Sequence, residues 1–323
     1  MSEHRHTVGV IGCGNMGRNH IRVLSTMPEY ELVGCYDTRP EAARTQAELY
    51  GTRAFESIDE LLSSIEVAHI VVPSFLHCDI ATKAAEHGCH VLVEKPIALT
   101  EADAQTIIDA CNRANTRLCV GHVERFNPAI RALAQILESE QIISVSFRRM
   151  SPFDPRVSDA SVVQDLMIHD IDVLNSIANS PIKEVVAHGA RVYTDSIDYC
   201  QALVTYEDGM CASLTASRVT EGKVRVAEVI CKDAFITVDY IGKSVEISRR
   251  TNFTLDVGHK FEYRQENIVE RVVVPLVEPL RAEFEHFAHC IDTGEDVLTS
   301  GPMGKAALAL CTRIEQATGL TNS

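Results

Sequence analysis

The first 121 residues alternate between short apolar runs and amphipathic segments. The apolar runs are typical of strands buried on both faces of a sheet, and they cover residues 7–11, 31–36, 67–72, 89–93 and 118–121. The segments between them carry apolar residues at helical spacing, which predicts helices near 16–27, 41–50, 57–64, 79–87 and 101–114. Repeated β-α units of this length predict the fold class α/β, with a doubly wound parallel sheet.

The pattern changes after residue 121. Helices are predicted at 126–137 and 161–177, on either side of an alternating strand at 142–150. Strands then follow one another without helices, at 184–192, 199–206, 210–217, 224–231, 234–239, 244–247 and 268–274. Two helices, 280–291 and 303–317, close the chain. We therefore expect two domains, 1–122 and 123–323, the second an α/β domain with a large, mostly antiparallel open sheet.

Composition narrows the class of protein. The chain of 323 residues has no run of eighteen apolar residues, which disfavours a membrane span, and residues 1–6 lack the apolar segment of a signal peptide. Its eleven cysteines form no Cys-x-x-Cys pair, so we expect buried, reduced thiols in a cytoplasmic protein. A formal charge of −15 disfavours nucleic acid as a partner. An anionic small molecule would have to be bound by a local cluster of arginines.

A glycine-rich turn follows the first strand. Gly12, Gly14 and Gly17 lie between the run at 7–11 and the first amphipathic helix, as in a Rossmann nucleotide-binding domain. The first glycine permits a tight turn, the second lets a pyrophosphate approach the backbone, and the third lets helix and strand pack closely. The helix N-terminus offers N–H groups and positive dipole to the phosphates. We therefore predict a dinucleotide site here.

The second strand ends in an acidic residue that bears on the choice of cofactor. Asp37 lies twenty residues after Gly17, where a carboxylate accepts hydrogen bonds from the adenosine ribose. A carboxylate there repels a 2′-phosphate, which favours NAD over NADP, although Arg39 lies close enough to weaken the preference. The alternative is that Asp37 caps the helix that starts at Pro40.

The strand at 89–93 leads directly into Glu94, Lys95 and Pro96. Because strands of an open parallel sheet carry chemistry at their carboxyl ends, Lys95 is a candidate catalytic amine; the alternative is a solvated loop charge. His77 begins a helix beside the Pro73-Ser74 turn, and helix capping and cofactor contact are both open for it.

Three ionisable residues share the predicted helix at 161–177. Asp165, His169 and Asp172 have spacings of four and three, so they face the same way among apolar neighbours. A histidine flanked by carboxylates is a suitable general base. The alternatives are a buried hydrogen-bond network without chemistry and a metal site. His286 and His289 are better interpreted as a partly exposed helix face than as metal ligands, and we expect no metal.

These motifs together resemble a known family. The order Gly12-x-Gly14-x-x-Gly17, Asp37, Glu94-Lys95-Pro96 and Asp165-x-x-x-His169 resembles the Gfo/Idh/MocA oxidoreductases over nearly the whole chain. The resemblance implies a Rossmann domain, a C-terminal domain whose open sheet forms the oligomer interface, a lysine at Lys95 near the nicotinamide, often before a cis proline, and an acid/base histidine at His169.

A narrower resemblance points to the substrate. The stretches His122 to Pro128, Asp154 to Arg156, Asp165 to Asp172 and Glu278 to Phe287 look like those of the UDP-N-acetylglucosamine 3-dehydrogenases, which oxidise the C3 hydroxyl of the sugar. This implies an NAD-dependent dehydrogenase of a sugar secondary alcohol, with Lys95 and His169 sharing acid/base catalysis and Asp165 orienting them. Which of the two is the proton acceptor stays open. Substrate contacts are expected from Arg125, Asn127, Arg156 and Asp172.

The expected cofactor contacts lie around the glycine turn and the carboxyl ends of the strands; they are Gly12, Gly14, Asn15, Met16, Gly17, Asp37, Thr38, Arg39, Pro73, Ser74, His77, Glu94 and Lys95. The expected assembly is a homodimer or homotetramer through the C-terminal sheet. Two alternatives remain: a relative that acts on inositol, a dihydrodiol or another sugar, in either direction, and a non-catalytic cofactor-binding regulator on the same fold. The regulator would have no need for both Lys95 and His169.

Overall fold

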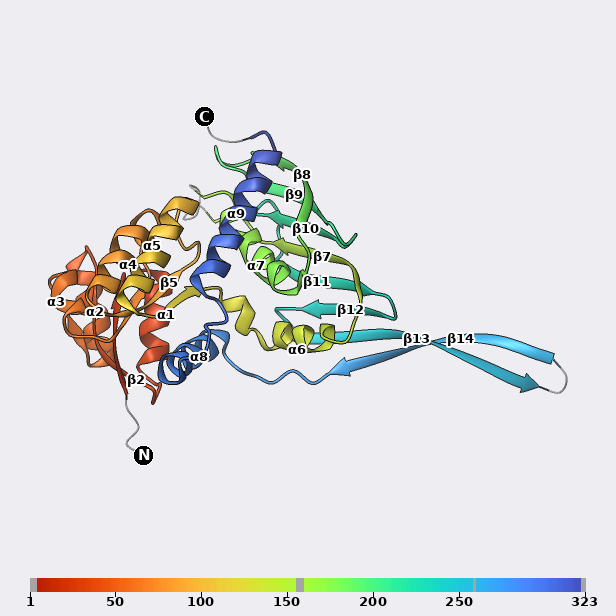
Figure 1. Cartoon of the computed structure of the whole chain (residues 1–323), viewed down its shortest axis with the longest axis horizontal. Helices are drawn as coiled ribbons and strands as arrows, with labels where there is room; N and C mark the ends of the chain where they lie inside the picture. Colours follow the sequence, from red (N-terminus) through yellow and green to blue (C-terminus); the bar gives the residue numbers. More distant parts are fainter. Residues whose placement is uncertain (1–4, 155–159, 258–259, 321–323) are drawn as a thin grey trace. The chain divides into compact units, whose positions relative to one another are not determined.

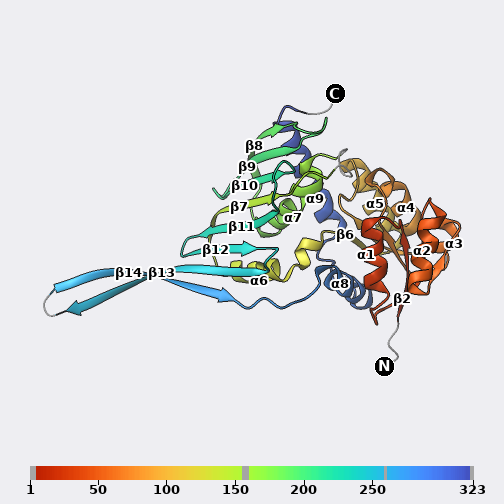
Figure 2. The same ribbon diagram turned by 180° about the vertical axis from the view of Figure 1, so that it is seen from behind.

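The computed structural model describes residues 5–154, 160–257 and 260–320. The chain divides into two compact units (Figures 1 and 2). The first unit contains Met1–Phe126 and Val277–Ala309, and the second contains Asn127–Leu276 and Leu310–Ser323. The predicted boundary after residue 122 does not include the return of residues 277–309 to the first unit. Arg156 and its neighbours at 155–159 lie outside the described residues.

The first unit is built on a six-stranded parallel sheet in the order β3-β2-β1-β4-β5-β6. Its strands are β1 (His6–Ile11), β2 (Tyr30–Tyr36), β3 (Arg53–Ala54), β4 (Val67–Ile70), β5 (His90–Glu94) and β6 (Leu118–Gly121). The strand order reverses between β1 and β4, and in such sheets ligands bind outside the carboxyl ends of the strands at that point. The predicted doubly wound sheet is confirmed.

Helices cover both faces of this sheet. One apolar core joins it to α3 (Ile58–Leu62), α4 (His77–Glu86) and α5 (Glu101–Ala114). The other joins it to α1 (Asn15–Leu24), α2 (Pro40–Tyr50) and α8 (Pro279–Thr293). Ser57 and Thr100 cap α3 and α5, each accepting a hydrogen bond from a backbone N–H three residues on, as their sequences predict. The first part of α9 (Gly301–Ala317) also packs in this unit, through Leu308.

The second unit is built on an eight-stranded sheet in the order β14-β13-β12-β11-β7-β10-β9-β8. Its strands are β7 (Ile142–Met150), β8 (Ile182–Ala190), β9 (Tyr199–Tyr206), β10 (Cys211–Ser217), β11 (Val224–Cys231), β12 (Ala234–Asp239), β13 (Ser244–Val257) and β14 (Lys260–Val272). Every neighbouring pair is antiparallel except β7 and β10, which are parallel. The predicted, mostly antiparallel sheet is therefore confirmed.

Helices lie on one face of this second sheet. They are α6 (Pro128–Leu137), α7 (Ile168–Ile177) and the last part of α9 (Figure 1). Residues of β9 alternate accordingly, with Cys200, Ala202 and Val204 buried and Gln201 and Leu203 exposed. No helix of the described residues is long and apolar enough to cross a membrane.

The last hairpin is longer than the sequence predicts. Strands were expected at 244–247 and 268–274, but β13 and β14 pair continuously from Val245 opposite Val272 to Val257 opposite Lys260. Only residues 244–249 also pair with β12. The stretch from 250 to 267 is mostly polar. It therefore lacks the alternation of hydrophobic and polar residues from which strands are predicted.

Candidate active site

The glycine turn leaves open space where a cofactor would approach. Gly12 has φ +99°, and a Cβ there would lie 2.2 Å from the carbonyl oxygen of Val71. A Cβ on Gly17 would lie 1.9 Å from the carbonyl oxygen of Gly12, so neither position tolerates a side chain. A Cβ on Gly14 would meet nothing within 4 Å. The residues thus fit a dinucleotide pyrophosphate at the start of α1.

Asp37 joins the end of β2 to this turn. Its Oδ2 accepts the backbone N–H of Cys13 at 2.8 Å, and its Oδ1 accepts the backbone N–H of Arg39 at 2.9 Å. The side chain of Arg39 is exposed and lies 3.4 Å from the same carboxylate. Helix α2 has no side-chain cap, so Asp37 does not cap it. Of the neighbouring candidates, Asn15, Met16 and Thr38 are also exposed.

The Glu94-Lys95-Pro96 turn follows β5 directly, and the Lys95–Pro96 peptide bond is cis. Glu94 Oε2 accepts the backbone N–H of Lys95 at 3.3 Å, and Glu94 Oε1 lies 3.0 Å from Nε2 of His20. Burial raises the pKa of Glu94, but the hydrogen bond from His20 and the charges of His20 and Lys95 outweigh it and leave that pKa below its ordinary value. Glu94 is therefore a carboxylate at neutral pH.

His77 lies beneath the same turn and is fully buried. Its Nδ1 lies 2.9 Å from the carbonyl oxygen of Pro96, and its Nε2 lies 2.9 Å from the carbonyl oxygen of Val72. Burial lowers the pKa of His77, partly offset by these carbonyls and by Glu94. No side chain caps α4, so His77 is not its cap. The His77 ring instead links the turn after β4, where Pro73 and Ser74 lie, to the turn after β5.

The segment that carries Asp165 and His169 is not one regular α-helix. A π-helical turn, Val163–Met167, contains Asp165 and leads into α7, which contains His169 and Asp172. π-Helical turns are rare and are often found at functional sites. Asp165 and His169 are partly buried, whereas Asp172 is only 1% exposed.

Asp170, which the sequence did not single out, makes a buried ion pair on α7. Both of its oxygens accept hydrogen bonds from Arg149 of β7, at 2.9 Å from Nε and 2.8 Å from Nη2. Both side chains are almost fully buried. The guanidinium also lies 5.2 Å from the ring centre of Tyr240. This pair fixes α7, and hence His169, on the sheet.

Two family models match the chain. The model described as "Oxidoreductase family, NAD-binding Rossmann fold" matches residues 6–122, and the "GFO/IDH/MocA C-terminal domain" matches residues 141–237. The UDP-N-acetylglucosamine 3-dehydrogenase of Acidithiobacillus ferrooxidans is 31% identical over 316 residues, which are 96% of each chain. The chain belongs to the Gfo/Idh/MocA family of oxidoreductases. It is therefore an oxidoreductase, and its first domain is of the NAD-binding Rossmann type.

Solved structures and a further relative are also similar to this Gfo/Idh/MocA member. A solved structure of the Acidithiobacillus ferrooxidans enzyme matches with a TM-score of 0.89 and 30% identity, covering 99% of this chain and 100% of that one. The inositol 2-dehydrogenase of Rhizobium meliloti is 26% identical over 94% of this chain and 93% of its own. A levoglucosan dehydrogenase solved with NADH and levoglucosan has a TM-score of 0.82 at 20% identity, covering 98% of each chain, and shares the fold.

The remaining sequence candidates of this oxidoreductase have mixed surroundings. Asn127 is 4% exposed and caps α6, since its side chain accepts the backbone N–H of Ala129. Arg125 lies partly buried in a 3-10 turn, Val123–Phe126. His286 accepts the backbone N–H of Leu298, and His289 pairs with Glu295. All eleven cysteines are free thiols, and burial raises the pKa of Cys89 to about 11.

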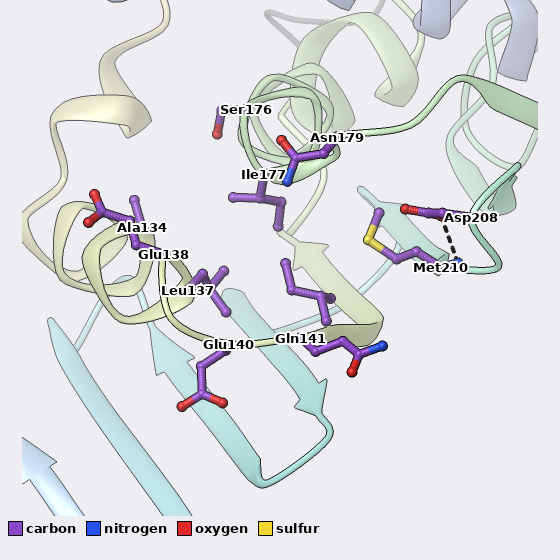
Figure 3. Close-up of a pocket in the computed structure, with 11 residues that line it drawn as sticks. Ala134, Leu137, Glu138, Glu140, Gln141, Ser176, Ile177, Asn179, Asp208 and Met210 are labelled. Carbon is purple, nitrogen blue, oxygen red and sulfur yellow. Dashed lines mark hydrogen bonds between the residues drawn. The ribbon is translucent and has the colours of Figure 1, made fainter.

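A cavity of about 510 Å³ lies in the second unit between α6, α7 and the adjoining strand ends (Figure 3). Its lining includes the apolar side chains of Leu137, Ile177 and Met210, and the acidic residues Glu138 and Asp208. None of the predicted catalytic, cofactor or substrate residues that the structure describes lines this cavity. It is therefore separate from the residues that the family motifs single out.

Proposed function

We propose that this oxidoreductase oxidises a secondary alcohol of a sugar, the C3 hydroxyl of a UDP-N-acetylhexosamine. The observation that carries the proposal is the relative named UDP-N-acetylglucosamine 3-dehydrogenase, which matches 96% of the chain at 31% identity and a TM-score of 0.89 in its solved form. Two features of the chain support a dehydrogenase of this family: the Glu94-Lys95-Pro96 turn at the end of β5, and His169 directly after a π-helical turn.

The proposed chemistry needs a hydride acceptor and a proton acceptor for one carbinol. When bound, NAD⁺ supplies the hydride acceptor. His169 takes the hydroxyl proton, and the Lys95 ammonium donates a hydrogen bond to the developing alkoxide, or the two residues exchange these roles. Asp165 orients His169. Arg125 and Arg156 are proposed to bind the diphosphate, for which a planar guanidinium is well suited.

Substrate profiling tests this proposal. We expect NADH to form with UDP-N-acetylglucosamine, and to form far more slowly with free N-acetylglucosamine and with myo-inositol. The inositol control matters because an inositol 2-dehydrogenase is also similar over 94% of the chain. Equal rates with the free sugar and its UDP form would refute the nucleotide-sugar substrate.

We also propose that the chain forms a homodimer or homotetramer through the open face of its second sheet. Neighbouring strands place exposed apolar residues side by side there, Val186 beside Leu203 and Ile230 beside Phe235. Exposed apolar residues paired on an open sheet face are typical of interfaces. Leu203→Lys should lower the mass measured by light scattering, whereas Gln201→Lys on the same strand should have less effect. A monomeric unmodified chain would contradict the proposal.

A further inference from the structure

Three polar side chains, two of them fully buried, are linked in sequence beneath the Glu94–Pro96 turn, within the first unit. Nε2 of His20 lies 3.0 Å from Oε1 of Glu94, and Nδ1 of His20 lies 3.1 Å from Nδ1 of His69. His20 comes from α1 and His69 from β4, and both are 0% exposed. Burying two imidazoles in an apolar core is costly unless their hydrogen bonds are made.

Aromatic packing fixes both rings. Phe284 of α8 contacts the two imidazoles, with ring centres 4.9 Å from His20 and 4.6 Å from His69. Tyr30 packs edge-on against His69, with ring centres 6.2 Å apart. Because these contacts hold the rings in place, Nε2 of His20 keeps its orientation toward Glu94.

The contacts also decide where the protons lie. Glu94 is ionised and must accept, so His20 donates from Nε2. Burial and the neighbouring His20 lower the pKa of His69 well below its ordinary value, which keeps that ring neutral. Nε2 of His69 has no hydrogen-bond partner among the described residues. His69 is therefore held to His20 through Nδ1 alone, and the Nε2–H of His20 points toward Glu94.

We infer that His20 and His69 are positioning residues, which hold the Glu94 carboxylate ionised and correctly oriented at the turn that carries Lys95. The inference rests on the proposed function, because it takes Glu94 as a cofactor contact. Without the donor on His20, burial would raise the pKa of Glu94. Glu94 would then take up a proton at a higher pH, and its contact with the cofactor would be lost at the acidic end of the working range.

Other ionisable groups also lie around Glu94. His77 of α4 is kept neutral by burial, and burial raises the pKa of the Cys119 thiol of β6 well above its ordinary value, with Glu283 of α8 and Glu94 itself adding to the effect. The charge of Lys95 lowers the pKa of Glu94 in every variant below. Glu283 and Lys95 are unchanged in every variant, so a difference in the acidic limb between the donor-free variants and His20→Gln is assigned to Glu94.

Cofactor binding by matched variants of His20 tests the inference. His20→Gln keeps an amide N–H that reaches Glu94, His20→Met has similar volume without a donor, and His20→Asn keeps a polar group that is too short to reach. We expect the NADH affinity of His20→Met and His20→Asn to fall about tenfold near pH 5 and to recover toward pH 8. His20→Gln should follow the unmodified chain throughout. Thermal melting on the same samples reports folding, and either donor-free variant suffices if the other does not fold.

Three results would overturn the inference. Donor-free variants that melt earlier yet bind NADH normally at every pH would make the histidines core residues only. A His20→Gln variant that behaves like His20→Met would show that the hydrogen bond is not the cause. Normal NADH binding by Glu94→Gln would remove the cofactor contact itself, while the proposal of a sugar substrate, measured by substrate profiling, would stand.

Discussion

Neutralising Asp37 should weaken the preference for NAD over NADP. The carboxylate is 8% exposed and is held by the N–H groups of Cys13 and Arg39. Two like charges about 4 Å apart near a protein surface repel by about 4 kcal/mol, and the guanidinium of Arg39, 3.4 Å from Asp37, offsets part of this. We expect the unmodified chain to prefer NAD by at least about tenfold, or 1.4 kcal/mol, and at most about a thousandfold.

The variants separate charge from loop anchoring. Asp37→Asn keeps an oxygen for the N–H of Cys13 but has no charge, so it should lose most of the preference and keep its affinity for NADH. Asp37→Ala also loses the anchor of the glycine turn and should bind both cofactors less tightly. Adding Arg39→Ala to Asp37→Asn should lower the affinity for NADPH alone.

The chain has no tryptophan, so titrations should follow the fluorescence of the reduced nicotinamide itself, or heat. Equal affinities of the unmodified chain for NADH and NADPH would refute the role of Asp37. So would an unchanged ratio in Asp37→Asn.

Three further predictions concern binding and stability. In denaturant melts, Asp170→Asn should lower the free energy of unfolding by about 3–5 kcal/mol, because it leaves the buried charge of Arg149 without its carboxylate. The control Arg148→Ala breaks an exposed pair and should lower it by less than about 1 kcal/mol. Arg156→Ala should raise KM for a UDP-sugar more than it lowers kcat, as expected for lost uniform binding; the opposite split would exclude a binding role. Burial raises the pKa of Asp198, but three backbone N–H donors outweigh it and lower that pKa. The unmodified chain should therefore melt at a higher temperature than Asp198→Asn above about pH 4, and this difference in melting temperature should shrink below that pH. A difference that stays constant with pH would contradict this.

The Rossmann sheet could be predicted because its strands are buried on both faces. Such strands have continuous apolar runs, as at Val91 to Val93, and each run ends where the chain must turn. The same logic placed Glu94 and Lys95 at a strand end. The family resemblance predicted the fold of both units and the enzyme class, which the comparisons confirm.

Contacts between distant parts of the sequence could not be predicted in this way. His20, His69 and Glu94 are brought together only by the parallel order of β1, β4 and β5 under α1. The apolar face of α8 predicts that the helix is buried against a sheet but not which sheet. In the structure α8 packs in the first unit. The pair of Arg149 and Asp170 depends likewise on how α7 lies on its sheet.

The acid/base roles of Lys95 and His169 are tested most directly by single-turnover hydride transfer from a UDP-sugar to NAD⁺, measured in the Lys95→Ala and His169→Ala variants beside thermal melting. We predict that each variant loses at least about a hundredfold in rate, since general acid–base groups contribute about 10² to 10⁴. The double variant should lose less than the product of the single losses, because the two groups act as one unit. Normal single-turnover rates in both folded single variants would contradict the catalytic roles.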